Sequence, residues 1–248
     1  MMYEKFALIY DALMADAPYD RWMEFFLTMQ KKFHPFARTV LDLACGTGEM
    51  SIRLAKAGFH VTGVDLSLDM LTVAQQKTSE AGVHIPFFQQ NMSELDVPGT
   101  FDVIIIFCDS LNYLEEETEV VETLRRCYHV LNPGGLLLFD VHAPQYIETG
   151  FIGKTFAYNG DDIAYIWNCF PGAHPYSVEH ELTFFVYDEE DDKYFRFDEL
   201  HKERTFPVEQ YQEWLTDSGF TIHTISGDFS GKPVTEQTER IFFTAQKR

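Results

Sequence analysis

The sequence predicts an α/β fold, in which an open, mostly parallel, doubly wound sheet of seven strands carries a smaller inserted antiparallel sheet. Between residues 39 and 142, apolar runs of strand length alternate with segments of helix length. This alternation is typical of a parallel sheet covered by helices on both faces. Between residues 145 and 206 the pattern changes to aromatic and acidic residues around an acidic turn, as in antiparallel strands.

Residues 1–36 precede the first predicted strand and are expected to form a helical cap. Ile9 and Leu13 recur at helical spacing, Pro18 interrupts the pattern, and Trp22 and Phe26 resume it. The sequence therefore predicts one or two amphipathic helices packed on the domain that follows.

The alternating region is expected to supply five strands and three helices. The strands are predicted at residues 39–44, 60–65, 84–89, 101–107 and 135–141, and the helices near 48–57, 68–81 and 115–131. Gly58 and Gly82 follow the first two helices, where a left-handed residue commonly ends a helix. Ser67 is a predicted N-cap of the second helix.

The rest of the chain is expected to form an insertion and a return to the main sheet. Residues 145–206 are predicted to be an antiparallel flap over the active site, with strands at 182–187 and 193–197 around the acidic turn 188–192. A helix at 207–218 and strands at 220–228 and 238–246 complete the sheet. The main domain is therefore predicted to comprise residues 1–144 and 207–248.

The charge balance restricts the partners of this protein. Its 248 residues include 19 basic and 39 acidic ones, for a net charge of −20, which repels nucleic acid and anionic membranes. No apolar run reaches the roughly 18–20 residues that span a bilayer. The start of the chain lacks the features of a signal peptide, and the four scattered cysteines are expected to be reduced thiols. We expect a cytoplasmic protein without nucleic-acid or membrane partners; its oligomeric state is unknown.

A glycine loop followed by a carboxylate predicts the cofactor class. Gly46 and Gly48 follow the first apolar run, and Asp65 ends the second, 19 positions after Gly46. An acidic residue at about this distance hydrogen-bonds the ribose of a nucleoside cofactor in α/β folds. Ser51 stands where a dinucleotide site would have its third glycine, which favours a nucleoside without a pyrophosphate over a nicotinamide cofactor.

These motifs resemble those of class I S-adenosylmethionine-dependent methyltransferases, which have a Rossmann-like fold. The resemblance rests on Asp-Leu-Ala-Cys-Gly-Thr-Gly at 42–48, Val-Asp-Leu-Ser-Leu-Asp-Met-Leu at 64–71 and Asn-Pro-Gly-Gly at 132–135, and it covers about residues 37–142. The rest is similar to a small-molecule subgroup with a helical lid and an inserted sheet, which includes amino-sugar N-methyltransferases. The resemblance implies methyl transfer by in-line displacement from S-adenosylmethionine to a nitrogen or oxygen of a small-molecule acceptor.

The same resemblance implies the residues that bind the cofactor. Asp65 should accept both ribose hydroxyls, and Asn91 stands where the family usually has an acidic residue near the adenine. For the aromatic residues and Met70, packing in the core is the alternative role. The other implied cofactor residues are Tyr10, Tyr19, Trp22, Ala44, Gly46, Gly48, Leu66, Met70, Met92 and Cys108.

Three polar residues near predicted strand ends are the catalytic candidates. Asp109 and Tyr113 follow the fourth strand, and His142 follows the fifth. In the resembling amino-sugar enzymes a histidine occupies the position of Tyr113. Because alignment of two reactants can supply about 7–11 kcal/mol, the reaction does not require a strong base. His180-Glu181 lacks the second histidine of a zinc motif, and no metal is expected. A non-catalytic nucleoside-binding module of the same fold is the alternative function.

Overall fold

The computed structural model describes residues 2–248, and it describes the side chains of residue 7 and of residues 9–248. Residue 1 of the predicted helical cap lies outside the described chain. The first half contains α1 (Met2–Leu13), α2 (Tyr19–Phe33), β1 (Thr39–Leu43), α3 (Glu49–Lys56), β2 (His60–Asp65), α4 (Leu68–Glu80), β3 (Phe87–Gln89), η1 (Met92–Glu94), β4 (Phe101–Ile106) and η2 (Ser110–Tyr113). None of the helices in the described chain has the length and apolar composition needed to cross a bilayer.

The second half completes the main sheet and contains the insertion. Its elements are α5 (Glu117–Val130), β5 (Leu131–His142), α6 (Pro144–Tyr146), η3 (Ile147–Phe151), β6 (Thr155–Asn159), β7 (Ile163–Pro171), β8 (Ser177–Asp188), β9 (Lys193–Arg204), α7 (Val208–Asp217), β10 (Phe220–Gly227) and β11 (Arg240–Lys247). In the described chain the main sheet has seven strands, in the order β10-β11-β5-β4-β1-β2-β3. Only β11 runs antiparallel to its neighbours, β5 and β10.

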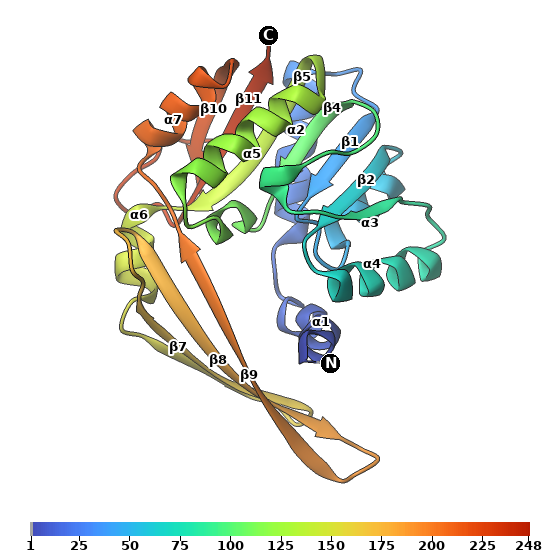
Figure 1. Ribbon diagram of the computed structural model, residues 1–248, viewed down its shortest axis with the longest axis vertical. Helices are drawn as coiled ribbons and strands as arrows, with labels where there is room; N and C mark the ends of the chain where they lie inside the picture. The colour runs from blue at the N-terminus through green and yellow to red at the C-terminus, as the bar shows by residue number, and fades with distance from the viewer. Residues whose placement is uncertain (1) are drawn as a thin grey trace.

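The main sheet is buried on both faces, because alternate residues of its central strands point to opposite sides. In β4, Val103 and Ile105 belong to the core beneath α2 and α3, whereas Ile104 and Ile106 belong to the core beneath α5 and α7. Figure 1 shows α5 and α7 across one face and α2 behind the other. This arrangement confirms the predicted α/β class and explains the nearly continuous apolar runs.

The inserted sheet is longer than the sequence predicted. Its four strands, in the order β6-β7-β8-β9, are antiparallel, and the paired strands β8 and β9 extend well away from the main sheet in Figure 1. The sequence did not predict β6 and β7, and it predicted only the part of β8 and β9 next to their turn. Ile9 of α1 packs with Phe184 and Phe197 of the insertion, so α1 lies against the inserted sheet.

Candidate active site

The loop after β1 leaves open space above its first glycine. Ala44, Gly46 and Gly48 all have positive φ angles, of 62°, 53° and 78°. A Cβ at Gly46 would meet no atom within 4 Å, whereas one at Gly48 would lie 3.1 Å from the Cβ of Ala74 in α4. Gly48 therefore allows close packing of the loop on α4, while Gly46 leaves its backbone accessible to a ligand.

Asp65, at the end of β2, is held beside this loop. Its Oδ2 accepts a hydrogen bond from the backbone N–H of Gly46 (2.8 Å), and its Oδ1 accepts one from that of Ser67 (2.8 Å). Burial raises the pKa of this carboxyl, and the two backbone donors partly offset the rise. The glycine loop and Asp65, which follows Gly46 by 19 positions in the sequence, are thus in direct contact.

A hollow of about 380 Å³, partly open to solvent, lies over the glycine loop. Its lining combines the loop, the end of β4 and two aromatic residues of the helical cap. The lining residues are Tyr10, Tyr19, Asp42, Ala44, Cys45, Gly46, Thr47, Glu49, Met50, Phe107, Cys108 and Ser110.

Trp22, the third aromatic residue predicted to close over the cofactor, is buried and does not line the hollow. Its indole N–H donates a hydrogen bond to Asp140 Oδ1 (2.9 Å). Its ring lies at 6.0 Å from that of Tyr19 and at 5.0 Å from that of Phe229. In this structure Trp22 supports the end of the sheet beneath the hollow.

The residues predicted to contact the adenine lie beside Asp65. Leu66 is 65% exposed, which is a high exposure for an aliphatic side chain that directly follows a strand. The amide oxygen of Asn91 accepts hydrogen bonds from the backbone N–H and the hydroxyl of Ser93. Met70 is half-buried in the first turn of α4, and Met92 packs against the main core. Leu66 therefore offers an apolar surface that is open to a planar ring.

The turn after β4 places Asp109 between Cys108 and Ser110, two residues that line the hollow. Cys108 and Asp109 have φ angles of 57° and 55°, a left-handed conformation that is unfavourable for residues other than glycine. The carboxylate of Asp140, in β5, accepts hydrogen bonds from both of their backbone N–H groups at 3.1 Å. Asp140 thereby stabilises the turn that directs Asp109 away from the strand.

Arg240, the first residue of β11, neutralises part of the negative charge of Asp109 and Asp140. Its Nη1 lies 2.6 Å from Asp109 Oδ1 and also donates to Asp140 Oδ2. Burial alone would raise the pKa of Asp109, but Arg240 and His142 hold it well below its ordinary range. Asp109 is therefore an ionised carboxylate at neutral pH.

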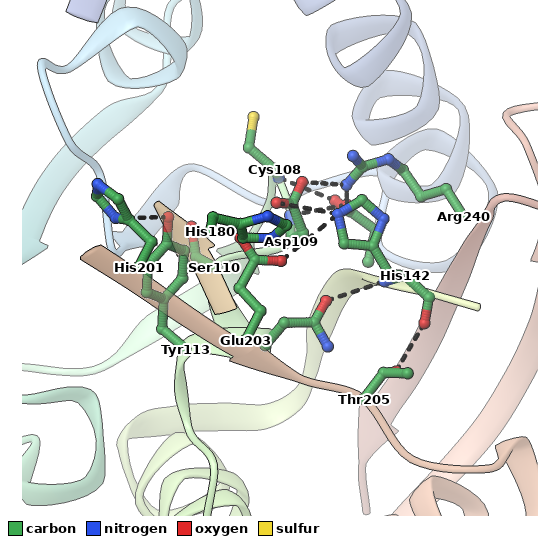
Figure 2. A network of polar contacts seen from close by, with 12 residues as sticks. Cys108, Asp109, Ser110, Tyr113, His142, His180, His201, Glu203, Thr205 and Arg240 are labelled. Carbon is green, nitrogen blue, oxygen red and sulfur yellow. Dashed lines mark hydrogen bonds and ion pairs between the residues drawn. The ribbon is translucent and has the colours of Figure 1, made fainter. Parts of the chain in front are cut away.

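His142 ends β5 and faces Asp109. Its backbone N–H donates to Asn112 Oδ1 (2.9 Å), and its carbonyl accepts from the hydroxyl of Thr205 (2.6 Å). Its ring Nε2 lies 3.4 Å from Asp109 Oδ2 and 3.7 Å from Glu203 Oε2. The structure thus brings together two of the predicted catalytic residues from different strand ends (Figure 2).

Glu203, in β9 of the inserted sheet, lies beside His142, and no pattern in the sequence predicted it. Its side chain is 6% exposed, and its Oε1 lies 3.7 Å from Nε2 of His180. Burial and the nearby Asp109 raise the pKa of Glu203 to about 7, and burial lowers that of His180 to about 4. In the sequence, Glu203 lies in a Glu-, His- and Lys-rich run that is indistinguishable from a solvated strand.

Tyr113, the remaining catalytic candidate, lies at the rim of this cluster. Its ring is 48% exposed, and its hydroxyl is 3.4 Å from Nδ1 of His201 in β9. The buried Asn112 donates a hydrogen bond to the carbonyl of Arg204 (2.8 Å). Asn112 thus joins the turn that carries Tyr113 and Asp109 to the inserted sheet.

A further buried carboxyl lies below the glycine loop. Asp42 of β1 accepts a hydrogen bond from the hydroxyl of Ser51 (2.5 Å), and burial raises its pKa to about 7. Ser51, which replaces the third glycine of a dinucleotide motif, therefore interacts with β1 and does not face a ligand phosphate.

Comparison with known proteins places the chain in a family. Residues 40–135 match the model of a methyltransferase domain. A protein of Geobacillus sp. (strain WCH70) whose name describes it as a methyltransferase is 51% identical, with both chains covered completely. A crystal structure of an S-adenosylmethionine-dependent methyltransferase from Clostridium acetobutylicum ATCC 824 is 30% identical, covers 100% of this chain and 99% of that one, and superposes with a TM-score of 0.89. The chain belongs to the S-adenosylmethionine-dependent methyltransferases.

Other members of this methyltransferase family agree with that assignment. YqeM of Bacillus subtilis (strain 168), whose name also describes it as a methyltransferase, is 48% identical over this whole chain and 98% of its own. A glycine/sarcosine N-methyltransferase of Aphanothece halophytica is 30% identical over 83% of this chain and 74% of its own. The sugar N-methyltransferase KedS8 from Streptoalloteichus sp ATCC 53650 shares the fold, with a TM-score of 0.79 at 22% identity, over 96% of this chain and 92% of its own. The class I resemblance and the S-adenosylmethionine cofactor inferred from the motifs are confirmed.

Proposed function

We propose that this methyltransferase transfers a methyl group to a nitrogen or oxygen atom of a small-molecule acceptor, bound between the cofactor hollow and the inserted sheet. The observation that carries the proposal is the pairing of Asp109 with His142 beside the hollow, with Glu203 of the inserted sheet on the opposite side. Asp109 lies directly between two residues that line the hollow, Cys108 and Ser110.

The residues around the hollow fit S-adenosylmethionine. Asp65 has the position and charge to accept the ribose hydroxyls, Leu66 offers an exposed apolar surface to the adenine, and the open space above Gly46 suits the methionine part. Tyr10 and Tyr19, from the helical cap, border the same hollow. When bound, S-adenosylmethionine supplies a methyl group activated by its positively charged sulfur, which aromatic faces attract by about 0.5–2 kcal/mol.

The remaining task of the chain is to orient the acceptor. We assign this role to Asp109, His142 and Tyr113, which can hydrogen-bond an amine or hydroxyl; of the three, His142 offers the ring nitrogen that can receive its proton. Alignment supplies about 7–11 kcal/mol, whereas proton acceptance adds about 10²–10⁴-fold in rate. Orientation is therefore the larger contribution.

Two features favour a small acceptor. Glu203 of the inserted sheet lies beside His142, and both Glu203 and its neighbour His180 are buried, which supports a site with little access for a polymer. The relatives named above include enzymes whose names state glycine, sarcosine or a sugar as the methylated compound.

The test is transfer of an isotopically labelled methyl group from S-adenosylmethionine to a cell extract, followed by separation by mass. We expect the label in the low-mass fraction together with S-adenosylhomocysteine, and much less label with the Asp65→Ala variant. Label in the protein or nucleic-acid fraction would contradict a small acceptor. Cofactor binding without any transfer would favour the non-catalytic module.

A further inference from the structure

We propose that Asp109, His142 and Glu203 form a binding site for one divalent transition-metal ion, such as Mn²⁺ or Zn²⁺. Each residue offers one ligand atom, and these three atoms lie within 4.8 Å of one another. They come from the turn after β4, the end of β5 and strand β9, so the site joins the main sheet to the insertion. Figure 2 shows the three side chains directed toward one another.

The first support is a buried ligand atom without a partner. Among the residues whose side chains are described, Oε2 of Glu203 has no hydrogen-bond partner, although the residue is 94% buried. A buried carboxylate oxygen left without a partner costs about 1–3 kcal/mol or more. This oxygen lies on the side of Glu203 that faces Nε2 of His142, at 3.7 Å, where a shared cation would satisfy both atoms.

The second support is the local charge. Arg240 pairs with two carboxylates, those of Asp109 and Asp140, and a third, that of Glu203, lies beside His142. Arg240 occupies Oδ1 of Asp109 and Oδ2 of Asp140, and Oδ2 of Asp109 is directed to His142. Two carboxylates and one imidazole are a donor set typical of Mn²⁺, Fe²⁺ or Zn²⁺, with bonds of about 2.0–2.2 Å for Zn²⁺.

The present separations are close to those of a coordinated set. His142 Nε2 is 3.4 Å from the oxygen of Asp109 and 3.7 Å from that of Glu203, so side-chain adjustments of about an ångström would bring the three atoms around an ion. The sequence holds no signal of this site, because its ligands are separated by 33 and 61 positions and no spacing motif connects them.

This site goes beyond the proposed function and changes one detail of it. An ion with three protein ligands keeps positions open for an acceptor oxygen or nitrogen, whose pKa it lowers. In the metal-bound protein, His142 would be a ligand, and the proton of the acceptor would leave to solvent.

The test is direct metal binding by the full chain, without cofactor or acceptor. After chelation and dialysis, Mn²⁺ is titrated with detection of the free ion by electron paramagnetic resonance, and Zn²⁺ is titrated by calorimetry. We expect one ion per chain and at least tenfold weaker binding in Glu203→Gln and in Asp109→Asn. Glu199→Gln is the matched control, because Glu199 is also a buried carboxylate of β9 but is not among the three ligands; this variant should bind as the wild type does.

Melting temperature with and without metal gives a second measurement and verifies folding of each variant. The wild type should melt higher with metal, and Glu203→Gln should lose this increase. Absence of stoichiometric binding of both ions, or equal affinity in the wild type and both ligand variants, would overturn the proposal. Neither outcome depends on cofactor binding or turnover, so the proposed methyl transfer is tested separately.

Discussion

At the scale of single residues, the site depends on a buried charge network that imposes an unfavourable backbone conformation. Cys108 and Asp109 are both left-handed, and the carboxylate of Asp140 holds their N–H groups. Left-handed residues other than glycine cost of order 1–3 kcal/mol each. Asp140 is in turn held by Trp22 and Arg240, so three segments distant in sequence fix one turn.

Replacing Arg240 with methionine should destabilise the protein strongly. The substitution leaves Asp109 and Asp140 without their common cation, and removing one partner of a buried ion pair costs about 3–5 kcal/mol. Urea denaturation measures this loss. Arg196→Met is the matched control, because Arg196 pairs with Asp198 on the exposed surface of the insertion, and it should change stability little. Equal effects of the two substitutions would refute the assignment.

Replacing Asp65 with alanine should weaken S-adenosylmethionine binding by about 10- to 150-fold, since a hydrogen bond to a charged group contributes about 1.5–3 kcal/mol. Calorimetry measures the affinity. Asp69→Asn, an acidic-to-neutral change in the first turn of α4, should leave it nearly unchanged. An Asp65→Ala variant that is folded and binds normally would remove the basis of the cofactor assignment.

At the scale of elements, one aspartate of α1 connects this helix to the glycine loop through a hydrogen bond. Asp11 accepts hydrogen bonds from the hydroxyl of Thr47, in the loop, and from Lys77 of α4, both at 2.6 Å. Lys77 also pairs with Glu49 at the start of α3. These contacts hold α1, which also packs on the inserted sheet through Ile9, next to the hollow.

The Asp11→Asn variant should release S-adenosylmethionine faster, roughly two- to fivefold, because the pair it breaks is partly exposed and contributes at most about 1 kcal/mol. Stopped-flow measurement of cofactor dissociation tests this expectation. Asp16→Asn makes the same charge change on an exposed residue just after α1 and should have no effect. An unchanged rate in Asp11→Asn would show that α1 does not retain the cofactor.

At the scale of the whole molecule, the contribution of Asp42 to stability should decrease as pH rises toward neutrality. Burial raises the pKa of Asp42 from its ordinary 3.8 to about 7. The folded state therefore keeps this proton between about pH 4 and 7 while the unfolded state has lost it. Over that range the group should reduce the unfolding free energy by about 1.4 kcal/mol per pH unit. His180, whose pKa burial lowers from 6.5 to about 4, acts in the opposite sense between those two values. Asp109, whose pKa is lowered, does so only below its ordinary value of 3.8.

The Asp42→Asn variant isolates this contribution, because it removes one titrating group and leaves the others in place. Urea denaturation at several pH values between 4 and 7 should show a flatter dependence in the variant than in the wild type. Asp96→Asn, a change at an exposed carboxylate, should keep the slope of the wild type. Parallel curves for Asp42→Asn and the wild type would contradict the raised pKa.

The sequence predicted the main sheet well and the make-up of the candidate site only in part, for physical reasons. Strands buried on both faces need apolar runs such as 101–107, and these are visible without a structure. Glu203 and Arg240 were missed because their burial depends on strands paired across the whole fold. Asp140 carried a visible signal, a single carboxylate within the apolar run 136–141, which indicates a buried polar contact.

The position of β11 has a consequence for synthesis of the protein. Among the strands of the main sheet it is the last in the sequence, yet it lies between β5 and β10. A nascent chain emerging from the ribosome therefore keeps an edge of β5 uncovered until residues 240–247 have left the exit tunnel. Arg240 arrives with that strand, so until then Asp109 and Asp140 lack their common cation and the turn after β4 lacks part of its support.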